Sequence, residues 1–120
     1  MNRARSDLAL ARAKGEGIYL EDLCFHAQQA AEKAIKALLI RHRIQFPYVH
    51  DLAVLMLLLE KGTGNLPDSI RRAVRLTRFA VQARYPGTAP PVGEEKYREA
   101  VELAGEVLRW AEKQLRAARR

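Results

Sequence analysis

Apolar residues recur along this chain at the three- and four-residue spacing of amphipathic helices. The longest such segment covers residues 19–43 and contains nothing that breaks a helix. At roughly 100° per residue, its apolar face consists of Leu20, Leu23, Cys24, Ala27, Ala30, Ala31, Ala34, Ile35 and Leu38. Because the centre of this face is alanine, a neighbouring helix can approach it closely. The segment is predicted to be the central helix of the fold.

The opposite side of the same segment carries a polar row. It consists of Asp22, His26, Gln29 and Lys33, at spacings of four, three and four residues. Such a row is either a solvated surface or one half of a functional site. The pattern alone does not decide between the two.

Four further helices are predicted, at residues 2–14, 50–61, 67–85 and 94–119. Glycine and proline separate them, as at Gly15, Gly17, Pro47 and Gly87. Strand-like alternation is lacking throughout. The sequence therefore predicts an all-α fold, an up-and-down bundle of about five helices with two long ones, and one domain over residues 1–120.

The segment 67–85 is predicted to present an apolar face and a basic stripe. The stripe consists of Arg71, Arg75, Arg78 and Gln82, within roughly 60° of one another. It fits a solvated face or an anion-binding surface. Arg84 falls on the apolar arc, together with Ile70 and Val81. An inward guanidinium needs a partner or a cavity, which makes Arg84 the best functional candidate.

The charge balance of the chain indicates which kinds of partner it can bind. There are 21 Lys and Arg against 14 Asp and Glu, a net charge of +7, which favours anionic partners such as nucleotides or nucleic acid. No leader peptide and no membrane-spanning run is recognisable, so a cytoplasmic protein without a membrane association is expected. The single cysteine, Cys24, lies on the apolar face and is expected to be buried and inert.

The motifs of common enzymes are missing. There is no glycine-rich phosphate loop and no H-E-x-x-H pattern, and the three histidines lack a metal-binding arrangement. Neither a metal nor another cofactor is expected. The remaining polar groups could bind phosphate, or could cleave RNA with a histidine as base and an arginine on the phosphate.

Several short segments together form a family pattern. They are Ser6-Asp7-Leu8, Tyr19, residues 25–34, His50-Asp51-Leu52, Leu76-Thr77 and Arg84-Tyr85-Pro86. In this order they resemble the bacterial and archaeal HEPN domain over essentially the whole chain. The resemblance implies a four- to five-helix bundle that commonly forms a homodimer. It also implies pairing with a minimal nucleotidyltransferase as a toxin–antitoxin system.

Many HEPN proteins are metal-independent endoribonucleases, and their signature is an arginine followed after four to six residues by a histidine. Here no histidine follows His50, so Arg84 has none downstream. Arg43 and His50 have the required spacing but flank the Phe46-Pro47 connection. The triplet Arg84-Tyr85-Pro86 stands in place of the signature.

Three hypotheses follow. The first is a HEPN component of a nucleotidyltransferase pair that binds nucleotide or RNA in a basic cleft near Arg84, with binding residues Arg84, Tyr85, Gln29, Lys33, Arg78 and Arg75. The second is a metal-independent endoribonuclease toxin in which Arg84 acts with His26 or His50. The third is a non-catalytic partner that docks on the nucleotidyltransferase through the polar row.

Overall fold

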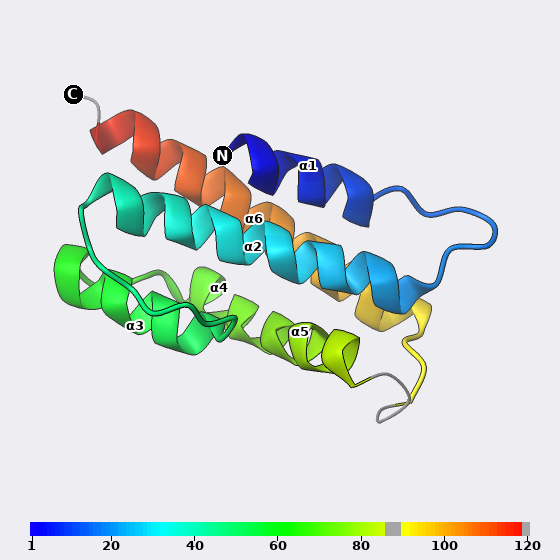
Figure 1. The fold of residues 1–120 in the computed structure, drawn as a ribbon. Coiled ribbons are helices and arrows are strands. Elements are labelled where there is room, and N and C mark those ends of the chain that lie inside the picture. The colour runs from blue at the N-terminus through cyan, green and yellow to red at the C-terminus, as the bar shows by residue number, and fades with distance from the viewer. Residues whose placement is uncertain (86–89, 119–120) are drawn as a thin grey trace.

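The computed structural model describes residues 1–85 and 90–118, which form helices and connecting loops without a strand. The helices are α1 (Asn2–Ala11), α2 (Leu20–Arg41), α3 (Leu52–Thr63), α4 (Asp68–Arg71), the 3₁₀ helix η1 (Arg72–Leu76), α5 (Thr77–Arg84) and α6 (Glu94–Ala118). Because α4, η1 and α5 follow one another directly, the chain forms five rods (Figure 1). The predicted all-α bundle with two long helices is confirmed.

Helix α2 is the centre of the bundle. It packs against α1 and α6 on one side and against α3 and α5 on the other (Figure 1). The predicted alanine face is confirmed, since Ala27, Ala30, Ala31 and Ala34 are all 0% exposed. Small side chains let the neighbouring helices come close to the backbone of α2. Cys24 lies on the same face and is also fully buried.

Helix α3 begins where the sequence predicts. The Asp51 carboxylate accepts a hydrogen bond of 2.9 Å from the backbone N–H of Ala53, so it caps the helix as well as facing its dipole. The sequence of α3 is apolar around most of the helix, but not all of its apolar residues are buried. Its buried residues are Leu52, Leu55, Met56 and Leu59, whereas Val54 and Leu57 are exposed.

The predicted continuous helix at 67–85 is wrong, and so is the inward position of Arg84. The middle of this rod is the 3₁₀ helix η1, which advances about 120° per residue instead of about 100°. Five such residues turn the following helix by about 100° relative to the predicted face. As a result, Arg84 and Val81 are exposed, and Phe79 is buried instead.

Of the helices in the described part of the chain, none combines the length and the apolar character needed to cross a lipid bilayer. The predicted end of the last helix at residue 119, like Pro86 and Gly87 after α5, lies outside the described residues.

Candidate functional site

The polar row on α2 is covered by α1. Asp7, on α1, is only 7% exposed and receives two members of the row. The Nζ atom of Lys33 donates to Asp7 Oδ2 at 2.5 Å, and Nδ1 of His26 lies 3.1 Å from Asp7 Oδ1. An ionised carboxylate only accepts hydrogen bonds, so Nδ1 donates in this contact, and in the neutral imidazole Nε2 is then the acceptor. His26 and Lys33 are therefore held in place by α1, whereas Asp22 is exposed and Gln29 contacts Gln28 instead.

A second buried carboxylate organises the other flank of α2. Glu32 is 3% exposed and accepts from Gln28 Nε2 and Lys36 Nζ, each at 2.9 Å. Nδ1 of His50 lies 2.9 Å from the same carboxylate. Burial raises the pKa of Glu32, but the hydrogen bonds from these three residues outweigh it and hold the pKa below its ordinary value.

Sequence reasoning missed the buried polar residues Asp7, Gln28 and Glu32. The spacing of Glu32 and Lys36 is that of an i,i+4 ion pair on a helix surface, and the pair forms, but the Glu32 carboxylate is buried. A signal was available for Asp7, which lies three residues after Ala4 and four before Ala11, both on the apolar side of α1. A charged residue at such a position needs a partner from another element.

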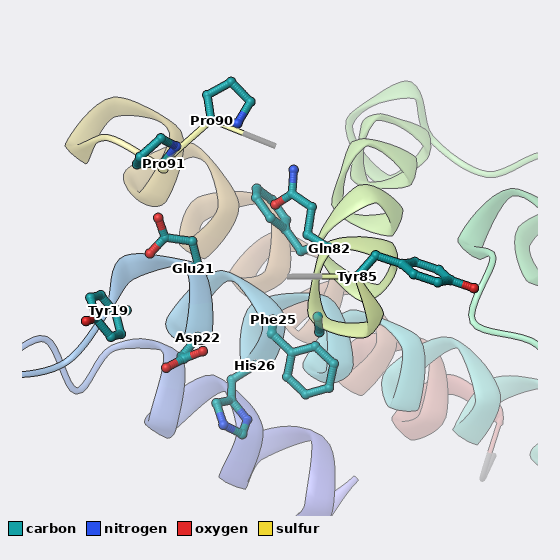
Figure 2. Close-up of a pocket in the computed structure, with 11 residues that line it drawn as sticks. Tyr19, Glu21, Asp22, Phe25, His26, Gln82, Tyr85, Pro90 and Pro91 are labelled. Carbon is teal, nitrogen blue, oxygen red and sulfur yellow. The ribbon is translucent and has the colours of Figure 1, made fainter. Parts of the chain in front are cut away.

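A cavity of about 700 Å³ lies between the first turns of α2, the end of α5 and the segment that leads into α6 (Figure 2). We call it the aromatic pocket. Its lining consists of Tyr19, Glu21, Asp22, Phe25, His26, Phe79, Gln82, Ala83, Tyr85, Pro90 and Pro91. Glu21 also fixes one wall, because its Oε1 accepts a hydrogen bond of 2.9 Å from the Val92 N–H. Within the described lining, two carboxylates face no lysine or arginine.

A group of cationic residues lies in a groove between α1, α2 and the end of α6. We call it the basic groove. Its charged lining residues are Arg3, Arg5, Lys33, Lys36, Arg116 and one carboxylate, Glu112. The remaining lining residues are Met1, Asn2, Ala4, Ala37, Ile40 and Leu115. Lys33, on the polar row, therefore belongs to the groove, whereas His26 on the same row belongs to the pocket.

The structure does not join the predicted cleft residues into one site. Arg84 is exposed, and its neighbours Ala83 and Tyr85 line the aromatic pocket. Gln29 donates to Gln28 Oε1 at 3.0 Å and belongs to the network around Glu32. With Lys33 in the groove, a basic cleft that unites these residues is not found in the described part of the chain.

The predicted basic stripe is mostly engaged in other contacts. Arg71 pairs with Glu60, and Arg75 pairs with Glu99 of α6 at 3.5 Å. The guanidinium of Arg78 lies 4.7 Å from the centre of the Phe79 ring. Arg75 and Arg78 line a separate small cavity with Lys96 and Glu99. Only the Arg75–Glu99 pair joins the stripe to α6, and the stripe does not form one open anion site in the described part of the chain.

Comparison with known proteins shows the family of this chain. The family model of the HEPN domain matches residues 1–114. The chain belongs to the HEPN family. It is also similar to the crystal structure of ST0689, an archaeal HEPN homologue, at 29% sequence identity and a TM-score of 0.72. That match covers 94% of this chain and 92% of the other.

A search of curated proteins gives no match. Membership in the HEPN family supports a role related to nucleotides or RNA in general terms, and HEPN domains often dimerise.

Proposed function

We propose that this HEPN domain binds a nucleotide, with the base in the aromatic pocket and the phosphate outside it. The observation that carries the proposal is the combination of ring faces and carboxylates in a cavity of about 700 Å³. A cavity of this size is typical of small-molecule sites, and aromatic faces stack on nucleobases. The family assignment adds weight to this ligand class.

The charges of the pocket decide which end of the nucleotide enters. Glu21 and Asp22 repel phosphate but accept hydrogen bonds from base N–H groups. Guanine presents two neighbouring N–H donors on its pairing edge, and one carboxylate can accept both. Adenine presents a ring-nitrogen acceptor at the corresponding position. We therefore expect the pocket to prefer guanine, through the exposed carboxylate of Asp22.

Arg84 keeps a place in this proposal at the edge of the pocket. It is exposed at the last residue of α5, between two pocket residues, Ala83 and Tyr85. From there a guanidinium can contact the phosphate of a nucleotide whose base lies inside. Arg84→Ala should therefore weaken binding of GMP while leaving guanosine binding unchanged.

Calorimetric titration with GMP and AMP tests the proposal. GMP should bind at least about fivefold more tightly than AMP, and Asp22→Asn should remove that preference. Asp68→Asn is the matched control, because Asp68 is also in the first turn of a helix, is 95% exposed and lies outside the pocket. Equal GMP and AMP affinities, or identical effects of both variants, would contradict the proposed base orientation. No binding of either nucleotide would refute the pocket altogether.

A second function is favoured by one observation, the pairing of His26 with Asp7. A carboxylate that holds Nδ1 leaves Nε2 as a general base, which is what cleavage of RNA by its own 2′-hydroxyl needs. In this alternative the domain is a metal-independent endoribonuclease, and Arg84 stabilises the phosphate. His50 has the same arrangement, because its Nδ1 is held by the buried Glu32, but it is not among the residues that line the pocket beside Arg84.

Incubation of the purified protein with RNA in the presence of EDTA tests the alternative of a metal-independent endoribonuclease. Cleavage that is lost in His26→Ala but retained in His42→Ala supports it, since His42 is an exposed histidine at the end of α2. Intact RNA after prolonged incubation rejects it. Cleavage that survives in His26→Ala would also reject His26 as the base.

The wider assembly is also a proposal. The HEPN resemblance supports a homodimer and a toxin–antitoxin-like pair with a minimal nucleotidyltransferase. Light scattering on the isolated chain should give about twice the monomer mass of 13.6 kDa. A monomeric mass at micromolar concentration would argue against the homodimer, and failure to co-purify with a nucleotidyltransferase encoded next to it would argue against the pair.

A further inference from the structure

The basic groove has more positive charge than its own carboxylate can balance. Five lysine and arginine side chains line it against Glu112 alone. Arg5 pairs with Glu112 at 3.2 Å, while Lys33 and Lys36 pair with carboxylates beneath the groove. Arg3 and Arg116 have no ion pair within the described residues. Each paired lysine still has further N–H donors to offer. The two unpaired arginines and the spare N–H donors of the lysines fit a ligand with more than one negative charge.

The groove and the aromatic pocket meet at one buried residue. Asp7 holds His26 of the pocket through Oδ1 and Lys33 of the groove through Oδ2. His26 and Lys33 are seven residues apart on α2, so their positions along the helix differ by about 10 Å. A few nucleotides of a flexible strand bridge such a distance. One ligand can therefore occupy both sites at once.

We propose that the groove and the pocket together bind a single-stranded polynucleotide, with its backbone along the groove and one base in the pocket. This inference rests on the proposed function of the pocket and extends it from a free nucleotide to a strand. A single strand fits because the base that enters the pocket must be free of pairing and stacking. The phosphates then remain outside the acidic pocket, where Arg3, Lys33 and Arg116 meet them.

The groove also has an apolar part that a strand could use. Ile40 is 67% exposed and lies among the groove residues, next to Ala37 on α2. An exposed apolar side chain between cations is suited to contact with a base or a ribose face. This feature favours a polynucleotide over a simple polyanion, which offers only charge.

Anisotropy titration of labelled oligonucleotides of one, three, six and ten residues tests the inference, each carrying one guanine in a uracil background. Affinity should rise at least about tenfold between one and six residues and then change little. In the double variant Arg3→Ala/Arg116→Ala, affinity for the ten-residue strand should fall about tenfold. For the double variant, the slope of the logarithm of the binding constant against the logarithm of the salt concentration should be shallower by about 1.4. Each lost phosphate contact on a single strand removes about 0.7 from that slope. GMP binding should be unchanged.

The matched control is Arg72→Ala/Arg98→Ala, which removes the same charge from exposed arginines outside both sites. Equal losses in the two double variants would show a general charge effect and overturn the inference. Affinity that does not depend on length, or equal affinity for a duplex or for an acidic peptide of the same charge, would also overturn it.

Two further comparisons show which polynucleotide binds and whether the pocket or the strand is refuted. Single-stranded RNA and DNA of one sequence distinguish which polynucleotide is the ligand, and both outcomes support a strand. If GMP binds but length has no effect, the strand is refuted and the pocket stands. If GMP does not bind, the pocket is refuted, and the two-site strand falls with it.

Discussion

Glu32 provides the sharpest test of the polar network on α2. The substitution Glu32→Gln keeps the shape of the side chain but replaces one acceptor oxygen by an N–H₂ donor. In the structure, both oxygens of the buried carboxylate face donors, from Gln28 and His50 on one side and from Lys36 on the other. In either orientation, the new amide nitrogen therefore faces a donor. At least one buried hydrogen bond is lost, together with the charge that balances Lys36.

The expected loss of free energy of unfolding is large for a substitution that replaces a single atom. Removing one partner from a buried ion pair costs about 3 kcal/mol, because the other charge remains without compensation. In a chain of 120 residues, this corresponds to a fall in melting temperature of about 10 °C. Urea unfolding followed by circular dichroism at pH 7 measures the change. Glu102→Gln, at an exposed position on α6, is the control and should change stability by less than about 0.5 kcal/mol.

The pH dependence of folding stability provides a second test of the Glu32 carboxylate. Because the pKa of Glu32 is lower in the folded protein, its contribution to stability is present above the ordinary value of 4.5. The contribution is lost as the pH falls through the lower folded pKa. Glu32→Gln should therefore lose less stability than the native chain as the pH falls below 4.5. A loss under about 1 kcal/mol at pH 7 together with an unchanged acid profile would refute the network.

Three other predictions concern single residues. Burial raises the pKa of Cys24 to about 11, so its thiol should react with a thiol reagent at pH 8 only after unfolding; rapid reaction of the folded chain would contradict the assignment. Gly64 has φ of 105°, so Gly64→Ala should cost about 1–2 kcal/mol in urea unfolding, and a neutral effect would show that the turn adapts. Asp7→Asn should cost about 2 kcal/mol, because it weakens the pairs with both His26 and Lys33. Its stability should then depend less on salt, and an unchanged stability would contradict the role of Asp7.

Much of the fold could be predicted from periodicity alone. The alanine face of α2 and the start of α3 at Asp51 depend on local spacing and capping, which a single sequence shows directly. Arg84 shows the limit of that approach. Its predicted inward position required a uniform helix, and the five residues of η1 changed the phase of everything that follows. Nothing in the sequence of η1 breaks a helix, so the tighter turn had no local signal.

The candidate site was harder to predict because its contacts are long-range. Two residues of the polar row, His26 and Lys33, are held by Asp7, which is 19 residues before His26 and 26 before Lys33. The Glu32 network likewise needs His50, which is 18 residues away in the loop before α3. The sequence made Lys33 and Tyr85 candidates for one cleft and gave no means of placing them in different cavities. The groove lies between α1, α2 and α6, whereas the pocket lies between α2, α5 and the segment before α6.

The place at which a nucleotide binds this protein can be measured directly by amide chemical-shift mapping. On titration of the ¹⁵N-labelled chain with GMP, we predict the largest shifts at the amides of Asp22, Phe25 and Gln82 around the aromatic pocket. The amides of Arg3 and Arg116 should shift only when a longer strand is added. Shifts from GMP that are confined to the basic groove, or no shifts at saturating nucleotide, would contradict the account.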